Sequence, residues 1–408
     1  MWFLGLLLAW SCSAPAGETL RARASALSPV PNLEPDPTNR VSENLSAARF
    51  GQALFFAPGL SGEGELSCAS CHQPEAGFTD NAAVSLGKEA GQRNAPTVLD
   101  SAYERWFFRD GRADTLWGQG LQPLESSLEM AGSRTGTVRF LLARPDLRKA
   151  YSEVFDNTLE SFDAVQLPEH ARPVFGEAGH PHALAWDALD PAVRANIDRV
   201  FANLGKALAA YERKLVSGLS PFDLWAAGEK NAISVSAQRG FELFVDSAGC
   251  LRCHSGPRFT DGEFHNLGVP PRGGGSPWDP ARFEGARRVR VDPFGSAGIH
   301  SDDPEGDRSL ATRTLRVSGE DWGAFKTPSL RNVARTGPYM HAGQFATLHE
   351  VLSYYSTLEG AMTGGHHAEQ TLQAADLTDR QIDDLVAFLE SLTTADPPAD
   401  LLGPPASH

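Results

Sequence analysis

A chain of 408 residues with 41% apolar residues is long enough for two folded domains and apolar enough to bury a core in each. Its formal net charge of −15 at pH 7 argues against nucleic acid or an anionic membrane surface as a partner. A basic protein partner would suit this charge, although many acidic proteins have no such partner.

The first 16 residues predict an export signal. The apolar run Phe3–Trp10 is too short to span a bilayer, and Ala14-Pro15-Ala16 forms a small-x-small cleavage site. No Lys or Arg precedes the run, which is atypical of such signals. Cys12 is expected to be lost with the signal, because the residues before it fit a lipoprotein motif poorly; lipid anchoring is the alternative. Residues 17–40, rich in Pro, Ala and Ser, predict a flexible segment.

Two copies of the motif C-x-x-C-H are the strongest chemical signal in the chain. They use four of its five cysteines and include His72 and His254. The pattern is typical of c-type haem, in which both thiols bind the porphyrin and the adjacent His ligates the iron. Zinc or disulfides are the alternatives, but neither copy has a fourth zinc ligand nearby. We therefore predict two covalent haem c groups in the periplasm, attached through Cys68, Cys71, Cys250 and Cys253.

A longer repeat surrounds these motifs. In each copy an apolar helix with the pattern Gly-x-x-Leu-Phe precedes the haem motif, and Phe-Thr-Asp follows it. The first copy contains Gly51 and Phe78, and the second contains Gly240 and Phe259. Such a repeat predicts a mainly α protein with two related cytochrome c domains. Their predicted bounds are 41–215 for the N-terminal domain and 216–395 for the C-terminal domain, with a tail at 396–408.

The segments between the motifs are less informative. Residues 166–190 form a polar loop with three His, for which solvent exposure is the default and a metal site the alternative. Asp190-Pro191 opens a long helix whose apolar face predicts an interdomain core. Residues 269–323 are rich in Gly, Pro and Asp and predict an insertion loop. A capping box at Thr378-x-x-Gln381 predicts the start of the last helix.

Four further motifs accompany the two haem motifs. They are Arg93-Asn94-Ala95-Pro96-Thr97, Asp110-Gly111-Arg112-Ala113, Thr327-Pro328-Ser329-Leu330-Arg331-Asn332-Val333 and Pro338-Tyr339-Met340-His341. With them the chain resembles, over about residues 40–393, the bacterial dihaem cytochrome c peroxidases and their MauG-like relatives. This resemblance implies reaction with hydrogen peroxide over the N-terminal haem.

The resemblance implies a peroxide pocket made by Gln119, Pro123 and the catalytic glutamate Glu129. A carboxylate there can move a proton between the two peroxide oxygens; a solvated helix residue is the alternative for Glu129. In the ordinary peroxidases, a His from the loop before Arg-Asn-Ala-Pro closes this haem at rest. Here the loop 85–92 contains no His and has Lys88 at the expected place. A Lys ligates only after losing its proton, so we predict an open, five-coordinate resting haem, as in MauG-like proteins.

The resemblance places the second axial ligand of the C-terminal haem at Tyr355, where the peroxidases commonly have Met. Helical spacing predicts that Tyr355 points inward and that Tyr354 is turned away. Met340 and His341 are rival ligands. A Met ligand favours reduced iron and electron entry, whereas an anionic phenolate stabilises oxidised iron. With Tyr355 the second haem would share an oxidising equivalent with the first.

The family also has a calcium ion between its haems. The matching positions are the Asn94 side chain and the carbonyls of Thr336 and Pro338, which are hard oxygen ligands. At Arg109 the sequence departs from the family, which usually has Trp there between the haems. Candidate residues for electron hopping are Trp106 and Trp117, and for each an ordinary packing role is equally expected.

Three functions follow as expectations. The first is a periplasmic, peroxide-dependent oxidase that modifies an aromatic side chain of a partner protein. The missing loop His and Tyr355 favour it. Trp117 also lies where the subgroup that resembles the methanobactin-associated dihaem enzyme has Asp-Thr-Leu-Trp, and that enzyme modifies a partner's tryptophan. The second is a cytochrome c peroxidase that takes electrons from a small cytochrome c or a cupredoxin. The third is a dihaem electron carrier, against which Glu129 and an open first haem argue.

Overall fold

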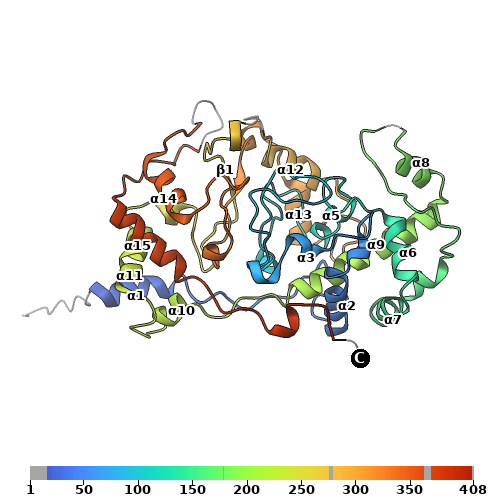
Figure 1. Ribbon diagram of the computed structural model, residues 1–408, viewed down its shortest axis with the longest axis horizontal. Coiled ribbons are helices and arrows are strands. Elements are labelled where there is room, and N and C mark those ends of the chain that lie inside the picture. Colours follow the sequence, from blue (N-terminus) through green and yellow to red (C-terminus); the bar gives the residue numbers. More distant parts are fainter. Residues whose placement is uncertain (1–15, 178, 275–278, 363–368, 407–408) are drawn as a thin grey trace, which may run out of the picture.

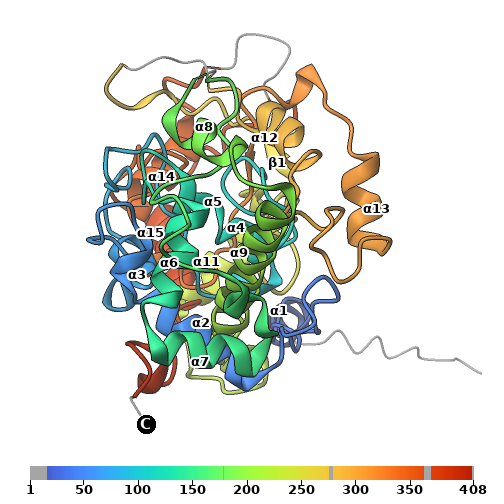
Figure 2. The same ribbon diagram turned by 90° about the vertical axis from the view of Figure 1, so that its right-hand side faces the viewer.

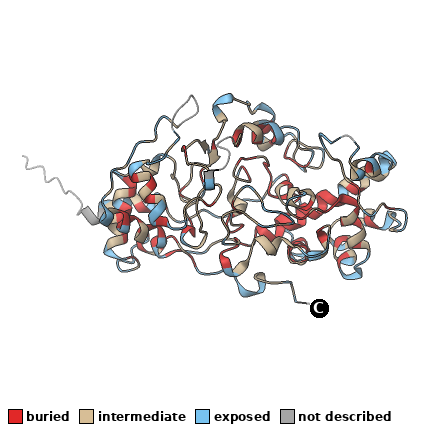
Figure 3. Cartoon of the chain, turned by 45° about the horizontal axis from the view of Figure 1, so that its top comes forward, coloured by how far each residue is buried: buried red, intermediate tan, exposed pale blue. Residues whose placement is uncertain are grey.

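The computed structural model in Figure 1 describes residues 16–177, 179–274, 279–362 and 369–406. It is mainly helical, as predicted, and its described strands are a single antiparallel pair, β1 with β2. Figure 3 shows buried helices gathered in two groups at opposite ends of the molecule, with loops between them. The elements are α1 (Ala16–Ser25), α2 (Leu45–Phe55), α3 (Cys68–Cys71), α4 (Leu116–Gln119), α5 (Gln122–Glu125), α6 (Arg134–Leu142), α7 (Pro145–Val154), α8 (Pro181–Asp187), α9 (Pro191–Glu212), α10 (Pro221–Ala226), α11 (Val235–Val245), β1 (Phe264–His265), α12 (Arg282–Val289), α13 (Asp307–Thr314), β2 (Phe325–Lys326), α14 (Leu348–Thr357) and α15 (Asp379–Glu390).

The first core forms where α2 crosses α9. Asp190 caps α9 by accepting from the Ala192 amide at 2.8 Å, and Pro191 occupies the first turn. A Cβ at Gly51 would lie 1.8 Å from the Ala207 carbonyl oxygen, so only glycine allows this approach. The apolar face of α9 fills the core of this domain, not an interdomain core as expected. Figure 2 looks onto this lobe, with α6 and α9 in front.

The second core repeats this arrangement with α11 crossing α15. A Cβ at Gly240 would lie 1.9 Å from the Asp384 carbonyl oxygen, which parallels Gly51 in the first core. The predicted capping box opens α15: the Thr378 amide donates to Gln381 Oε1 at 2.9 Å. The Gly-x-x-Leu-Phe pattern therefore marks one close helix crossing in each half of the chain.

The segment 17–40 differs from the flexible lead-in that its composition predicts. Its helix α1 lies beside α10 (Figure 1), and Ala24 and Leu27 are buried in the second core. Arg23 Nη1 donates to Asp246 Oδ1 at 2.8 Å. Composition alone could not show this, because the partners lie about 200 residues further along the chain. The predicted signal and Cys12 lie outside the described residues, apart from Ala16, where α1 begins.

The insertion and the tail also cross between the halves of the sequence. Within 269–323, the Ser296 amide donates to Asp114 Oδ1 at 2.9 Å, and Phe294 packs in the first core. In the tail 396–408, the carbonyls of Asp400 and Gly403 accept from Gln52 Nε2 in α2, at 2.6 and 2.7 Å. Both segments thus pack on the N-terminal domain, although they lie outside its predicted bounds of 41–215.

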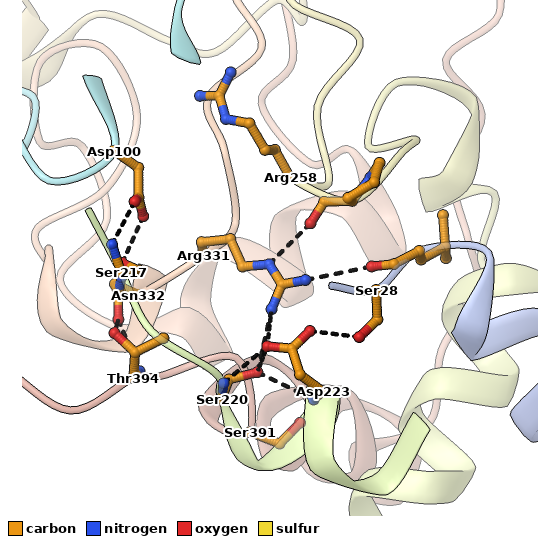
Figure 4. Close-up of polar contacts among 12 residues, drawn as sticks. Ser28, Asp100, Ser217, Ser220, Asp223, Arg258, Arg331, Asn332, Ser391 and Thr394 are labelled. Carbon is orange, nitrogen blue, oxygen red and sulfur yellow. Dashed lines mark hydrogen bonds and ion pairs between the residues drawn. The ribbon is translucent and has the colours of Figure 1, made fainter. Parts of the chain in front are cut away.

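A buried polar network joins the two halves of the chain (Figure 4). Arg331 Nη1 donates to Asp223 Oδ2 at 2.7 Å, and each side chain is only 2% exposed. The neighbouring Asn332 donates through Nδ2 to Ser217 Oγ at 2.7 Å, and Asp100 accepts from the Ser217 amide, also at 2.7 Å. The Thr327–Val333 motif therefore stabilises the connection between α9 and α10.

Of the helices that the structure describes, none has both the length and the apolar content that crossing a bilayer requires.

Candidate haem sites and peroxide pocket

The first C-x-x-C-H motif forms a short helix that orients its histidine. Ser67 caps α3, and the Ser67 amide donates to Ser70 Oγ at 3.0 Å. His72 ends the helix, and its Nδ1 lies 3.2 Å from the Phe78 carbonyl oxygen. The Phe78 side chain is fully buried and its φ is 58°, which turns this carbonyl toward the ring. With Nδ1 donating to the carbonyl, Nε2 is free to ligate iron.

The second motif repeats this device. His254 Nδ1 lies 2.8 Å from the Phe259 carbonyl oxygen, and Phe259 is likewise fully buried with a φ of 53°. The Thr260 hydroxyl donates to the Thr327 carbonyl at 2.7 Å, which fixes the chain just after Phe259. The Phe-Thr-Asp repeat was visible in the sequence, but its role of holding the histidine tautomer was not.

The residues around the second motif fit a haem. A cavity of about 450 Å³ opens beside Cys250, Cys253 and His254, and most of its wall is apolar. The four described cysteines are all free, which excludes the disulfide alternative for them. A large apolar cavity beside two free thiols and an oriented imidazole is what covalent attachment of a porphyrin requires.

Tyr355 lines this cavity from α14, as predicted for an axial ligand. Burial, together with the nearby Cys250 and Cys253, raises the pKa of its phenol well above the usual value. Tyr354 is turned away from the cavity, as predicted, and is not among the described residues that line it. Its side chain is nevertheless buried, and its hydroxyl donates to the Leu267 carbonyl at 2.7 Å. In the described part of the chain, no such hydrogen bond engages the Tyr355 hydroxyl.

The two rival ligands, Met340 and His341, line the same cavity. His341 stacks on Phe325 with ring centroids 3.8 Å apart, and its Nε2 lies 2.9 Å from Gln344 Nε2. Burial is the main cause that lowers the pKa of His341 to about 4, so the ring stays neutral. The His341 ring is already in contact with Gln344 and Phe325. Tyr355 and Met340 are therefore the more available candidate ligands for the iron of the second haem.

Among the residues predicted to form the peroxide pocket, Glu129 lies close enough to the first motif for its charge to act on Cys71 and His72. Pro123 lies in α5 and accepts through its carbonyl from the Met130 amide at 3.2 Å, so the chain turns back at Glu129. Glu129 is half-buried. Burial raises the pKa of the Cys71 thiol to about 11, with smaller contributions from the negative charges of Asp80 and Glu129. Gln119 is half-buried at the end of α4.

Lys88 does not point into this pocket. Its backbone amide donates to the Glu129 carbonyl at 2.8 Å, so the loop 85–92 lies against the Glu129 turn. Its side chain is exposed, and Nζ donates to Glu63 Oε1 at 2.7 Å. That hydrogen bond raises the pKa of the ammonium, which therefore remains protonated and unable to ligate a metal.

The two tryptophans proposed for electron hopping are both packed. Trp106 lies under the Arg282 guanidinium, 4.4 Å from the ring centroid, and its carbonyl accepts from Lys326 Nζ at 2.8 Å. Trp117 is fully buried in the first core, and its Nε1 donates to Thr38 Oγ1 at 3.1 Å. Neither side chain is among those described around the second cavity, and a hopping role stays a prediction.

The predicted calcium ligands do not fit a calcium ion. Thr336 and Pro338 line the second cavity, but Asn94 Oδ1 accepts a hydrogen bond from Arg109 Nη2 at 2.7 Å. A guanidinium on the expected metal-binding oxygen repels a divalent cation. The sequence showed both Asn94 and the unusual Arg109, but not that they touch.

His265 was not singled out from the sequence. Its Nε2 lies 2.9 Å from Asp261 Oδ2 and its Nδ1 lies 2.7 Å from Glu369 Oε2, at the wall of the second cavity. With Cys253 and Asp261 it forms the one described group of three metal-type side chains whose ligand atoms converge within 4.8 Å. Cys253 belongs to the haem motif, so this group does not indicate a separate metal site. The three His of the loop 166–190 form no such group among the described residues.

Two helical domains with matching haem-binding loops define a dihaem c-type oxidoreductase. A family model described as di-haem cytochrome c peroxidase matches residues 46–231. The chain is 31% identical to cytochrome-c peroxidase IdrP1 of Denitromonas iodatirespirans, covering 97% of this chain and 93% of the relative. It is 33% identical to methylamine utilization protein MauG of Methylorubrum extorquens, covering 91% and 84%. The crystal structure of a MauG-like protein associated with microbial copper homeostasis aligns with a TM-score of 0.62 and 26% identity, covering 92% of this chain and 97% of that one. The chain belongs to the di-haem cytochrome c peroxidase and MauG family.

This membership confirms the predicted fold class and a peroxide-using oxidoreductase with two c-type haems. Relatives named as peroxidases and relatives named MauG match to a similar degree, so the family alone does not choose between the two functions.

Proposed function

We propose that this protein is a periplasmic oxidase that reacts with hydrogen peroxide in its unreduced resting state and oxidises an aromatic side chain of a partner protein. The observation that carries this proposal is the loop 85–92. It contains no His, and its one Lys pairs with Glu63 at the surface. The peroxide side of the first haem therefore has no protein ligand supplied by this loop.

When bound, the first haem supplies the iron that binds peroxide and accepts its oxidising equivalents. We assign Glu129 the proton transfer: it takes the proton from the near peroxide oxygen and returns it to the leaving oxygen. Gln119 donates a hydrogen bond to the bound peroxide, and Pro123 holds the turn that positions Glu129. Overall, one H2O2 gains two electrons from the partner's aromatic side chain and two protons, and two H2O leave.

Tyr355 supports oxidation over electron relay. We propose that its phenol loses its proton as the oxygen binds the iron of the second haem, so that the ligand is a phenolate. With this anionic oxygen ligand, a bound second haem would have a lower reduction potential, which would favour sharing of oxidising equivalents over inward relay of electrons. The periplasm is proposed because an export signal is predicted at 1–16 and because c-type haem is attached outside the inner membrane.

The alternative is a cytochrome c peroxidase that reduces H2O2 with electrons from a small cytochrome c or cupredoxin. Its support is the relative named as a cytochrome-c peroxidase at 31% identity, together with Met340 in the second cavity. A thioether ligand from Met340 would raise the potential of the second haem and favour electron entry.

Stopped-flow absorbance of the fully oxidised protein mixed with hydrogen peroxide separates the two functions. We expect a rapid spectral change without prior reduction and a product that decays slowly in the absence of a partner. The alternative requires the reverse: no reaction of the oxidised protein, and fast turnover with reduced cytochrome c only after one haem has been reduced.

A further inference from the structure

Arg109 lies where the two halves of the chain meet. Its guanidinium donates through Nη2 to Asn94 Oδ1 at 2.7 Å, and its carbonyl accepts from the Lys326 amide in β2 at 2.8 Å. Asn94 in turn donates its backbone amide to the His341 carbonyl at 2.9 Å. Arg109 and Asn94 thus connect the N-terminal half to two segments of the C-terminal half.

The orientation of Asn94 leaves its oxygen for a cation. Its side chain is almost fully buried, and Nδ2 donates to the Ala82 carbonyl at 2.8 Å. Since the NH2 group is used there, Oδ1 is the acceptor that faces the interface, and Arg109 already occupies it. A calcium ion binds oxygens at about 2.3–2.6 Å, so on this oxygen it would lie almost in contact with the guanidinium.

The charges of the protein side chains around Asn94 also disfavour a second cation. Among the described residues, no carboxylate forms an ion pair with Arg109, and its Nε is buried without a partner. Burial, with a contribution from Arg93, lowers the pKa of Arg109 to about 10, which leaves it charged at neutral pH. Arg93 itself is neutralised by Asp110 and Asp279 at 2.5 and 2.7 Å. The expected calcium ligands, an amide and two carbonyls, are all neutral.

We propose that Arg109 takes the place of the interdomain calcium ion, so that this protein joins its two haem domains without calcium. The positive charge comes from the chain, and Asn94 accepts a hydrogen bond where it would otherwise ligate a metal. This inference does not depend on the proposed function, because it concerns assembly of the domains and not their reaction with peroxide.

Metal analysis of the purified protein with both haems attached tests the proposal first. After gel filtration in calcium-free buffer we expect less than about 0.1 Ca²⁺ per chain, a substoichiometric amount for a site built for calcium. We also expect no change in melting temperature or haem absorbance on adding EGTA or 1 mM CaCl2. About one Ca²⁺ per chain, with loss of the native haem spectrum in EGTA, would overturn the proposal.

Arg109→Gln provides the complementary test, because it removes the charge and frees Asn94 Oδ1. This variant is expected to melt at a lower temperature, and added CaCl2 should restore part of the loss; Arg109→Lys, which keeps the charge, should remain insensitive to calcium. Arg105→Gln, an equal charge change at an exposed position of the same loop, is the matched control. If Arg109→Gln proves as stable and as calcium-insensitive as Arg105→Gln, the Arg109 guanidinium does not replace a calcium ion at this site, and the proposal is wrong. Should Arg109→Gln fail to fold, the calcium content of the wild type still decides.

Discussion

Replacing Glu129 by Gln is expected to slow the reaction of the oxidised protein with hydrogen peroxide by roughly 10²- to 10⁴-fold, the usual contribution of a positioned acid–base group. Gln keeps the size and the hydrogen bonds of the side chain but cannot exchange a proton. The turn that carries Glu129 is held by backbone hydrogen bonds to Lys88 and Pro123, so the substitution should leave it in place. The observed rate constant in stopped-flow absorbance, as a function of peroxide concentration, measures the effect.

Glu89→Gln is the control for this substitution. Glu89 is exposed, lies on the adjacent loop, and its backbone amide donates to the Leu128 carbonyl at 3.0 Å, so the same charge is lost close by. We expect a rate constant within about twofold of the wild type, because no proton-transfer role is lost. If both variants retain the wild-type rate, Glu129 is the solvated residue that was the alternative interpretation, and the proton must move through another group.

Replacing Tyr355 by Phe is expected to change the second haem more than any other single substitution in its cavity. Removing an anionic oxygen ligand should raise the reduction potential of that haem by on the order of 0.1 V or more, within the span of about 0.8 V that axial ligands set. The first haem, whose histidine is held by Phe78, should keep its potential. Spectroelectrochemical titration of the two haems measures both values in one experiment.

Tyr354→Phe is the matched control, because it removes the neighbouring hydroxyl and loses only the hydrogen bond to the Leu267 carbonyl. It should cost about 1 kcal/mol of stability and leave both potentials unchanged. A different outcome would point to a rival ligand: if Tyr355→Phe leaves the second haem unchanged and Met340→Leu shifts it, a thioether holds the iron and the protein belongs with the electron-relaying peroxidases.

Local pattern was sufficient for the features that a few neighbouring residues determine. The C-x-x-C-H motifs, the repeated Gly-x-x-Leu-Phe helices and the cap at Thr378 depend on short-range chemistry, and the structure has all of them. Cavity-facing Tyr355 followed from helical spacing and from the family resemblance. Spacing also predicted that Tyr354 is turned away from the cavity, but not that its side chain is buried on a second side of α14 by the segment at Leu267.

The features that could not be predicted depend on contacts between distant segments. Residues 17–40 look flexible by composition, yet Leu27 is buried in a core built from residues beyond 220. The insertion 269–323 reads as a loop of the C-terminal half, yet Ser296 binds Asp114 of the N-terminal half. Arg109 looked like the loss of a tryptophan, and only its contact with Asn94 suggests a gain of charge. In each case the missing information was the partner, which no local pattern contains.

Low-temperature EPR of the resting, fully oxidised protein tests most directly whether the first haem is open. We predict a high-spin ferric signal from the N-terminal haem, unchanged in Lys88→Ala, because Lys88 pairs with Glu63 at the surface and provides no ligand. Low-spin signals from both haems in the resting wild type would contradict the account, since they would mean that a side chain closes the site where peroxide is proposed to bind.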